Sequence, residues 1–170
     1  MNLTSRLKSL CDQDAFLELH PKSKRPVSQD WPNQGQSAAE VLSTGNNIGL
    51  LLGSTSGLLD VDLDCREAVA LADILLPQPL AAFTRGSHDS GHYIYKATTT
   101  GPRKSFASTA KSTLVELRED GAQTMIPPSV HPNGSQLGFT SFNENAYPVA
   151  YDDLFKAVNL IAACSEIAQN

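Results

Sequence analysis

The segment LLDVDLDC, which spans Leu58–Cys65, places an aspartate at every second position of an apolar run. Because successive side chains of a β-strand point to opposite faces, Asp60, Asp62 and Asp64 are expected to share one face of a strand. Like charges at that spacing repel one another, and each carboxylate is costly to desolvate. A positive group is therefore expected among the aspartates, and a divalent cation is the leading candidate. The alternative is a solvated edge strand whose last aspartate caps the next helix.

A chain of 170 residues is long enough to bury a core without disulfides, and it predicts a single domain over residues 1–170. Charged residues make up 18% of the sequence and hydrophobic residues 41%, a composition typical of a globular protein. The net charge of −5 argues against a uniformly basic nucleic-acid-binding surface. It is compatible with a local basic groove, because carboxylates gathered at a metal site would supply part of the acidity.

The cysteines are widely separated and form no Cys-x-x-Cys pair, which argues against a zinc module or a disulfide framework. They are Cys11, Cys65 and Cys164. Free thiols are typical of a reducing cytoplasm, and the sequence shows neither a signal peptide nor an apolar run of membrane-spanning length. We therefore expect a cytoplasmic protein that does not act on a membrane.

Hydrophobic periodicity predicts four helices, with Ser37 and Glu40 in the capping-box positions of the second. These helices cover residues 3–10, 37–45, 65–77 and 151–168. Short β-rich segments bounded by turn residues predict strands at residues 15–19, 47–53, 56–64, 80–86, 91–97, 112–119, 122–128 and 139–143. This order of elements indicates an α+β fold with a mostly antiparallel sheet, in which the Asp-rich strand lies beside strands 91–97 and 112–119.

Phosphoryl transfer with divalent ions requires carboxylates from different strands to hold the ions, and a histidine or arginine to neutralise the triphosphate. The sequence supplies these parts in the Asp-rich strand, in His92 of SGHYIY and in Glu116 of LVELR. A histidine in a strand is more often a structural residue, but its position between two acidic segments favours a ligand role for His92. Glu116 taken alone would be expected to pair with Lys111 or Arg118.

Three stretches of the chain resemble the three motifs of the bifunctional primase–polymerase domain. This domain belongs to the archaeo-eukaryotic primase superfamily and is common in phage, plasmid and other mobile-element replication proteins. The stretches are NIGLLLG…SGLLDVDLDC, SGHYIY and LVELREDGAQTMIPPSVHPNG. The upstream segment KSKRPVSQDW resembles the Lys-Pro-aromatic segment that precedes the first motif in the family. The resemblance extends from about Phe16 to Gly134, and its last stretch is the most specific.

The resemblance implies an α+β fold with a mostly antiparallel, RRM-like catalytic sheet and flanking helices, and a catalytic site that binds Mg²⁺ or Mn²⁺. Asp60 and Asp62 are the preferred pair of metal ligands, with Asp64 left as a helix cap; Asp62 with Asp64 is the alternative pair. Glu116 matches the acid that completes the ion site. His92 matches the histidine that contacts the phosphates of the incoming nucleotide in the family.

Further residues are expected to contact nucleotide or DNA. The nucleotide-binding candidates beside His92 are Arg85, Arg118, Ser129 and His131. The last two lie in PPSVHPNG, which could alternatively serve only as a rigid turn. A basic cluster is expected to touch template phosphates, unless it is a solvated loop, and it consists of Lys22, Lys24 and Arg25. His88 is expected to be exposed to solvent.

The resemblance implies a template-directed DNA primase/polymerase, in which a primer 3′-hydroxyl attacks the α-phosphorus of a nucleotide and pyrophosphate leaves. Expected partners are a single-stranded DNA template, an NTP or dNTP, and a replicative helicase domain or protein, in a bacterial or phage-infected cell. A metal-dependent nuclease and a non-catalytic single-stranded-DNA-binding replication initiator are the alternatives. The chain is expected to be a stand-alone module or the N-terminal fragment of a longer replication protein.

Overall fold

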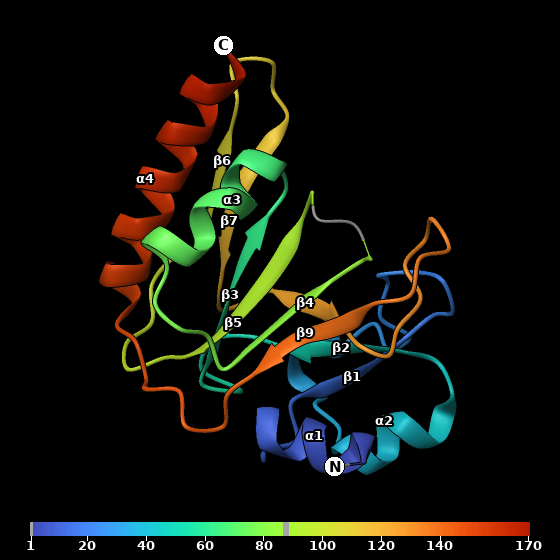
Figure 1. Ribbon diagram of the computed structural model, residues 1–170. Coiled ribbons are helices and arrows are strands. Elements are labelled where there is room, and N and C mark those ends of the chain that lie inside the picture. Colours follow the sequence, from blue (N-terminus) through green and yellow to red (C-terminus); the bar gives the residue numbers. More distant parts are fainter. Residues whose placement is uncertain (1, 87–88) are drawn as a thin grey trace.

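The computed structural model describes residues 2–86 and 89–170, so the predicted exposure of His88 lies outside the described residues (Figure 1). The described helices are α1 (Leu3–Leu10), the 3-10 helix η1 (Trp31–Asn33), α2 (Ala38–Thr44), α3 (Arg66–Leu75) and α4 (Tyr151–Gln169). The described strands are β1 (Phe16–Leu19), β2 (Asn47–Leu51), β3 (Leu58–Leu63), β4 (Ala81–Thr84), β5 (Gly91–Lys96), β6 (Lys104–Ala107), β7 (Thr113–Arg118), β8 (Gln123–Ile126) and β9 (Gly138–Phe142). Every predicted helix and strand is present, and β6 is added to them.

The strands form two antiparallel sheets, which confirms the α+β fold. One sheet has three strands in the order β1-β2-β8, and the other has six in the order β6-β7-β3-β5-β4-β9. The division into two sheets does not follow from the hydrophobic pattern, which identifies strands but not their partners. Strand β6 also escapes that pattern, because its sequence KSFA alternates only between half-buried and exposed residues and is held by pairing with β7.

Strand β3 lies inside the six-stranded sheet, antiparallel to β5 on one side and to β7 on the other. The predicted alternation along this strand is present. Leu59, Val61 and Leu63 are fully buried in the cluster that contains α3 and α4, and Asp60 and Asp62 therefore point to the opposite face. Residues directly opposite one another on paired strands share a face. The register of β3 thus decides which side chains of β5 and β7 lie beside the aspartates.

Two hydrophobic clusters lie on either side of this sheet. On the helix side, β3 and β7 pack against α3 and α4, with Leu154, Val158 and Ile161 of α4 fully buried. The second cluster joins α1, α2 and the three-stranded sheet to Phe83 and Ile94 of the six-stranded sheet. The acidic face of β3 is therefore on the side of the three-stranded sheet, and Figure 1 shows the helices α3 and α4 together on the other side.

Local capping explains where the helices begin. The Ser37 hydroxyl accepts from the N–H of Glu40, and the Glu40 carboxylate accepts from the N–H of Ser37, which is the predicted capping box of α2. The predicted cap of α3 is wrong, because Cys65 is the N-cap residue and makes no side-chain cap bond. Asp64 instead prolongs the pairing of β3, since its N–H donates to the Leu114 carbonyl of β7. Its side chain therefore stays on the acidic face.

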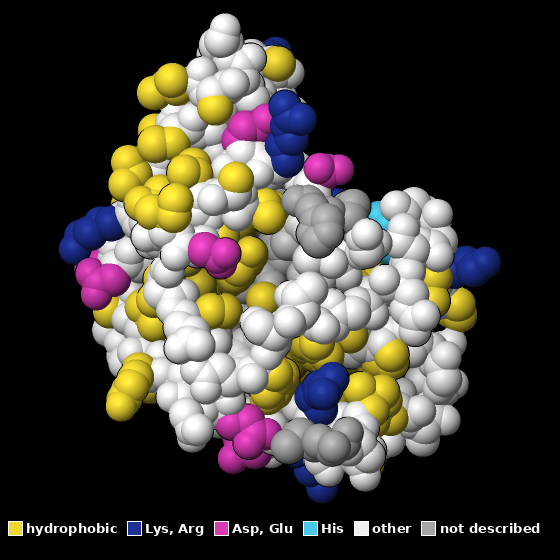
Figure 2. All heavy atoms as spheres, viewed as in Figure 1, with side chains coloured by type: hydrophobic (Ala, Val, Ile, Leu, Met, Phe, Trp, Pro, Cys, Tyr) yellow, Lys and Arg dark blue, Asp and Glu magenta, His cyan; other side chains and the backbone are white. Residues whose placement is uncertain are grey.

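An apolar region of the surface lies over two of the helices. No helix among the described residues has the length and apolarity required to cross a membrane. Figure 2 shows hydrophobic side chains gathered over α3 and α4, where Ile74, Leu160 and Ile167 are exposed. On the face shown, lysines and arginines are scattered rather than gathered into one patch.

Leu154→Ala should lower the free energy of unfolding by about 2–5 kcal/mol, because it leaves a cavity beneath α4. Leu154 is fully buried in the cluster between α4 and the six-stranded sheet. Leu160→Ala is the matched control, since Leu160 lies on the same helix with 49% of its surface exposed, and it should cost much less. Urea unfolding measures both values, and equal losses would contradict the described packing of α4.

Candidate active site

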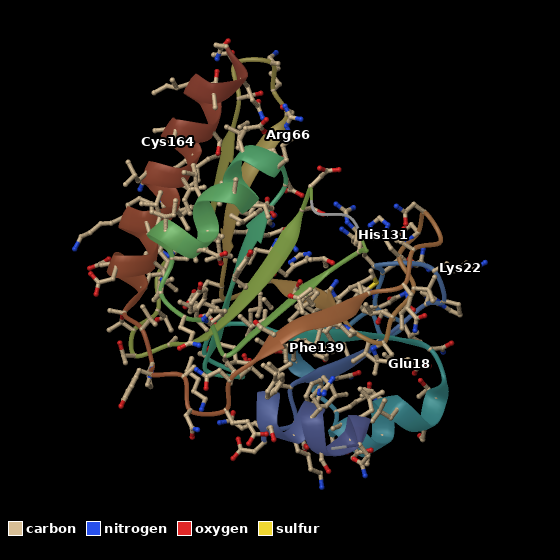
Figure 3. The ribbon with its side chains drawn as sticks, in the orientation of Figure 1. Glu18, Lys22, Arg66, His131, Phe139 and Cys164 are labelled. Carbon is tan, nitrogen blue, oxygen red and sulfur yellow. The ribbon has the colours of Figure 1, made fainter. Side chains whose placement is uncertain are left out.

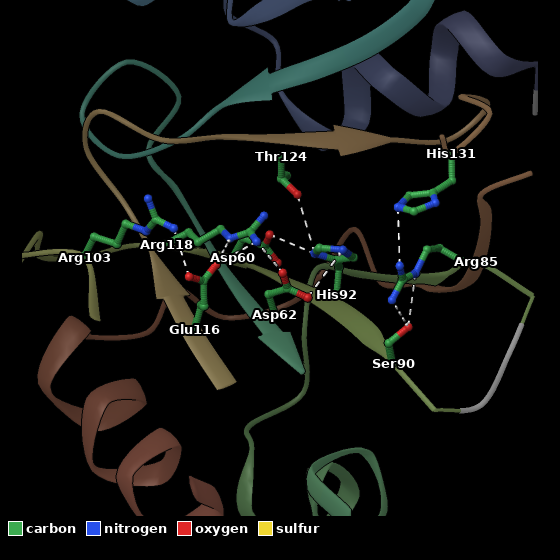
Figure 4. A network of polar contacts seen from close by, with 10 residues as sticks. All are labelled: Asp60, Asp62, Arg85, Ser90, His92, Arg103, Glu116, Arg118, Thr124 and His131. Carbon is green, nitrogen blue, oxygen red and sulfur yellow. Dashed lines mark hydrogen bonds and ion pairs between the residues drawn. The ribbon is translucent and has the colours of Figure 1, made fainter. Parts of the chain in front are cut away.

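Side chains from five strands form one row across the acidic face of the six-stranded sheet. The register places Phe83 of β4, His92 of β5, Asp62 of β3, Glu116 of β7 and Ser105 of β6 opposite one another in turn. Residues that are paired in this way share a face of the sheet. The predicted site residues His92, Asp62 and Glu116 therefore lie side by side, and Figure 4 shows the polar contacts among them and their neighbours.

The imidazole of His92 lies between two carboxylates of β3. Its Nδ1 is 3.0 Å from Oδ2 of Asp60, and its Nε2 is 3.5 Å from Oδ1 of Asp62. Burial alone would lower the pKa of His92, but Asp60 and then Asp62 raise this pKa above its ordinary value. Burial likewise would raise the pKa of Asp60, yet His92 and then Arg118 lower it on balance. Asp60 and His92 therefore form a buried ion pair.

A guanidinium occupies the position between the carboxylates of β3 and β7. Nη2 of Arg118 lies 2.5 Å from Oδ2 of Asp62 and 2.7 Å from Oε2 of Glu116. Arg103, which precedes β6, places its Nη2 2.9 Å from Oε1 of Glu116. Burial would raise the pKa of Glu116, but Arg118 and then Arg103 lower it. Part of the positive charge expected beside the aspartates is thus supplied by the protein itself.

Asp64 lies just beyond the end of β3, close to Asp62 and Glu116. Burial, and then the carboxylate of Asp62, raise the pKa of Asp64 to about 6; Glu116 adds to this rise, while Arg118 and His92 oppose it. Within residues 2–86 and 89–170, no three metal-ligating side chains are already arranged around one point. The donor chemistry nevertheless fits a hard divalent cation, because Asp62, Asp64 and Glu116 offer carboxylate oxygens.

A pocket beside His92 is lined by residues of both sheets. Strand β8 contributes one wall, and β5 and β7 contribute to the other. The lining residues are Lys24, Arg85, His92, Arg118, Gln123, Thr124, Met125, His131 and Leu137. The pocket therefore lies where the acidic row of the six-stranded sheet meets the three-stranded sheet.

Positive charge concentrates in this pocket. The Arg85 guanidinium donates to the Ser90 hydroxyl at 2.9 Å and lies 3.3 Å from Nε2 of His131. Within the described parts of the chain, neither Arg85 nor Lys24 forms an ion pair with a carboxylate. Burial, and then the charges of Arg85 and Lys24, lower the pKa of His131 despite a hydrogen bond from Asn133. Such unbalanced cations suit a bound polyanion.

The basic cluster of the N-terminal loop, which consists of Lys22, Lys24 and Arg25, contributes only one residue to the pocket. Lys24, which the sequence groups with the template-binding residues, lines the pocket. Lys22 and Arg25 are exposed on the same loop and are not part of the pocket lining. Figure 3 shows Lys22 at the end of the molecule that also carries His131. Lys24 of this loop therefore lines the pocket, whereas Lys22 and Arg25 lie at the surface beside it.

Two predicted site residues, Ser129 and Asp60, are buried. Ser129 is buried, and its hydroxyl accepts from the N–H of Ile48 at 2.8 Å and donates to the Ile48 carbonyl at 3.3 Å. The prediction that Ser129 lines the nucleotide pocket is therefore wrong, because its hydroxyl stabilises the backbone of β2. Asp60 is fully buried, and its Oδ2 bonds to His92. Asp62 is 3% exposed and Asp64 is exposed, so the alternative pair, Asp62 with Asp64, is the more accessible of the two pairs.

Three further polar residues at the site do not follow from the sequence analysis. Arg103 contacts Glu116, Thr124 Oγ1 lies 3.5 Å from Nδ1 of His92, and Gln123 lines the pocket. Arg103 precedes β6, which has a weak strand pattern, and the other two lie on β8, whose place opposite β5 depends on the two-sheet arrangement. The polar pair Gln-Thr inside the otherwise apolar AQTMI is the sequence signal that could have identified them.

Comparison with known proteins places the chain in a family. A comparison with curated proteins finds no match. The Prim-Pol family, described as bifunctional DNA primase/polymerase, N-terminal, matches residues 12–150. This range contains all nine described strands, the acidic row and every residue that lines the pocket. The chain therefore belongs to the Prim-Pol family of bifunctional DNA primase/polymerase N-terminal domains.

Proposed function

We propose that the protein is a template-directed DNA primase/polymerase, a nucleotidyltransferase that joins NTPs or dNTPs on single-stranded DNA with Mg²⁺ or Mn²⁺. Membership of a DNA primase/polymerase family implies a DNA template and nucleotide substrates. The observation that carries the proposal is a pocket lined by the cations of Lys24, Arg85 and Arg118 that lies beside the carboxylates of β3 and β7. A nucleotide whose triphosphate meets these cations would present its α-phosphorus toward the carboxylates.

Asp62, Asp64 and Glu116 are the residues proposed to hold the divalent ions. They come from β7 and from the end of β3, and burial and then the charge of Asp62 raise the pKa of Asp64, so a bound cation would relieve the repulsion between these carboxylates. Arg118 supports this assignment, because its guanidinium lies where Asp62 and Glu116 can share one cation. When bound, the ions would activate the primer 3′-hydroxyl and neutralise charge on the phosphate oxygens.

The triphosphate is proposed to bind His92, Arg85, His131 and Lys24. Because His92 is paired with Asp60 through Nδ1, its Nε2–H is the proton available to a phosphate oxygen. The guanidinium fork of Arg85 suits bidentate contact with phosphate. Its neighbours Ser90 and His131 are uncharged partners, so a phosphate would not have to displace a carboxylate.

The template is proposed to contact the N-terminal loop through its exposed cations, Lys22 and Arg25. Backbone phosphates are the part of single-stranded DNA that such cations recognise, independently of sequence. The same loop places Lys24 in the nucleotide pocket, so a template strand held by it would pass beside the incoming nucleotide. A replicative helicase domain or protein is the further partner that we propose for this module.

Incubation of the protein with a primed single-stranded template, Mn²⁺ and labelled nucleotides tests the proposal. Extension of the primer would support it. Shortening of the DNA would indicate a metal-dependent nuclease instead, and a mobility shift without either reaction would indicate a DNA-binding replication initiator. Unprimed single-stranded circles, assayed in parallel with NTPs and with dNTPs, separate primer synthesis from extension and give the nucleotide preference.

Asp62→Asn should reduce primer extension by several orders of magnitude, because it removes a charged ligand on which stabilisation of the transition state depends. Asp12→Asn is the matched control, since Asp12 is an exposed carboxylate outside the site, and it should retain the parent activity. Mn²⁺ should raise the melting temperature of the parent and of Asp12→Asn, but much less that of Asp62→Asn. Equal Mn²⁺ shifts in all three proteins would contradict the ion assignment.

Asp64→Asn should alter the pH dependence of stability in metal-free buffer. The folded pKa of Asp64, about 6, is above its unfolded value, so the protonated carboxyl stabilises the fold at low pH and this contribution is lost as the pH rises through the folded pKa. The variant should therefore match the parent at about pH 4 and exceed its stability at about pH 7. Urea unfolding at both pH values measures this, and a difference that is constant with pH would refute the raised pKa.

Arg85→Ala should weaken nucleotide binding by roughly tenfold or more, because a charged hydrogen bond to phosphate is lost. Binding of single-stranded DNA should change little, since Lys22 and Arg25 lie outside the pocket. Arg66→Ala is the control, because the Arg66 side chain is 79% exposed on α3. Calorimetry with a non-hydrolysable dNTP and fluorescence anisotropy with labelled DNA report the two affinities. Equal losses in both would place Arg85 on the DNA path instead.

A further inference from the structure

Asp60 is the most deeply buried aspartate of β3, with no exposed surface. Its Oδ2 is 3.0 Å from Nδ1 of His92, whereas its Oδ1 is buried and has no hydrogen-bond partner among the described residues. Its direct neighbour on β5 is Ile94, which is also fully buried. Burying a carboxylate with an unsatisfied oxygen costs free energy, and the ion pair with His92 offsets this cost. The aspartate at this position is therefore tied to the imidazole of His92.

The imidazole of His92 is restrained by two different contacts. Phe83 stacks on the ring face, with centroids 4.7 Å apart and ring planes 13° apart. This contact fixes the plane of the ring but not its direction, because a half-turn about the Cβ–Cγ bond exchanges Nδ1 with Cδ2 and Nε2 with Cε1 within the same plane. The bond from Nδ1 to Asp60 removes that freedom, and Thr124 Oγ1 lies 3.5 Å from the same nitrogen. Nε2 is left on the side of Asp62 and the pocket.

We infer that Asp60 is a positioning residue for His92: its carboxylate fixes the ring so that Nε2–H points into the pocket and donates to a phosphate of the nucleotide. This inference rests on the proposed contact between His92 and the nucleotide. Figure 4 shows His92 with Asp60 on one side and with Arg85 and His131 on the other. Asp60 and Asp62, two residues apart on one face, thereby serve different tasks, since Asp60 orients a side chain and Asp62 faces an ion.

A double-mutant cycle on Asp60→Ala, His92→Ala and their combination tests the inference. Affinity for a non-hydrolysable dNTP is measured by calorimetry with Mn²⁺ present, and melting curves establish that each variant is folded. Each single variant should bind nucleotide roughly tenfold or more weakly than the parent, as expected for loss of a charged hydrogen bond. Because Asp60 acts through His92, the double variant should bind no more weakly than His92→Ala alone.

Asp60→Asn is the conservative variant, and it carries the test if Asp60→Ala does not fold. Its amide oxygen can still accept from Nδ1–H, so its nucleotide affinity should lie between those of the parent and His92→Ala. Titration with Mn²⁺ in the absence of nucleotide, followed by electron paramagnetic resonance, should give the parent affinity for Asp60→Asn. Asp62→Asn is the positive control in this titration and should bind Mn²⁺ more weakly.

Three results would overturn the inference. The first is a double variant that binds nucleotide more weakly than His92→Ala by the full factor seen for Asp60→Ala, since Asp60 would then act independently. The second is a lower Mn²⁺ affinity of Asp60→Asn, the behaviour of a metal ligand. The third is an unchanged nucleotide affinity of folded Asp60→Ala beside a weakened His92→Ala, the behaviour of a purely structural aspartate. An unchanged affinity of His92→Ala would instead refute the proposed phosphate contact itself, so the two failures are distinguishable.

Discussion

The pairing of β3 carboxylates with cations from both neighbouring strands is the interaction on which the sheet and its site depend. His92 of β5 lies against Asp60, and Arg118 of β7 lies against Asp62. A shift of β3 by one residue would turn these aspartates toward α3 and α4 and would bring Leu59, Val61 and Leu63 to the polar face. The hydrophobic alternation and the charge balance therefore select the same register, and the same register creates the acidic row.

The three-stranded sheet gives this row a second wall. Strand β8 lines the pocket opposite β5 and β7 with Gln123 and Thr124, and the neighbouring loops add Lys24 and His131. Interactions between charges are stronger where protein rather than water surrounds them. Two sheets that face one another can therefore strengthen the ion pairs and the charges of the pocket, whereas an open sheet would expose them to solvent. The three-stranded sheet thus contributes both to the hydrophobic core and to the polar wall of the pocket.

Patterns of neighbouring residues predict the helices and strands. Pairing between strands far apart in the sequence determines the site contacts that these patterns could not predict. Alternation in LLDVDLDC predicts β3, and the capping box predicts the start of α2, because both depend on residues close in sequence. His92 and Glu116 could be proposed beside the aspartates from their motifs, although their common row depends on strand register. Arg103 and Thr124 reach the site through β6 and β8, whose positions depend on distant partners. The sequence predicts that Ser129 contacts nucleotide, because it lies in one of the family-like stretches. Its hydroxyl instead forms hydrogen bonds with the backbone of β2.

The three aspartates of LLDVDLDC are chemically identical but differ in how deeply they are buried. Asp60 has no exposed surface and its pKa is lowered, because His92 and Arg118 outweigh the effect of burial. Asp64 lies beyond the end of β3, where burial and then the charge of Asp62 raise its pKa to about 6. Asp62 lies between them, within reach of Arg118 on one oxygen and of His92 on the other. The more exposed end of this gradient, at Asp62 and Asp64, is where we propose that a divalent ion binds, whereas Asp60 is held against His92.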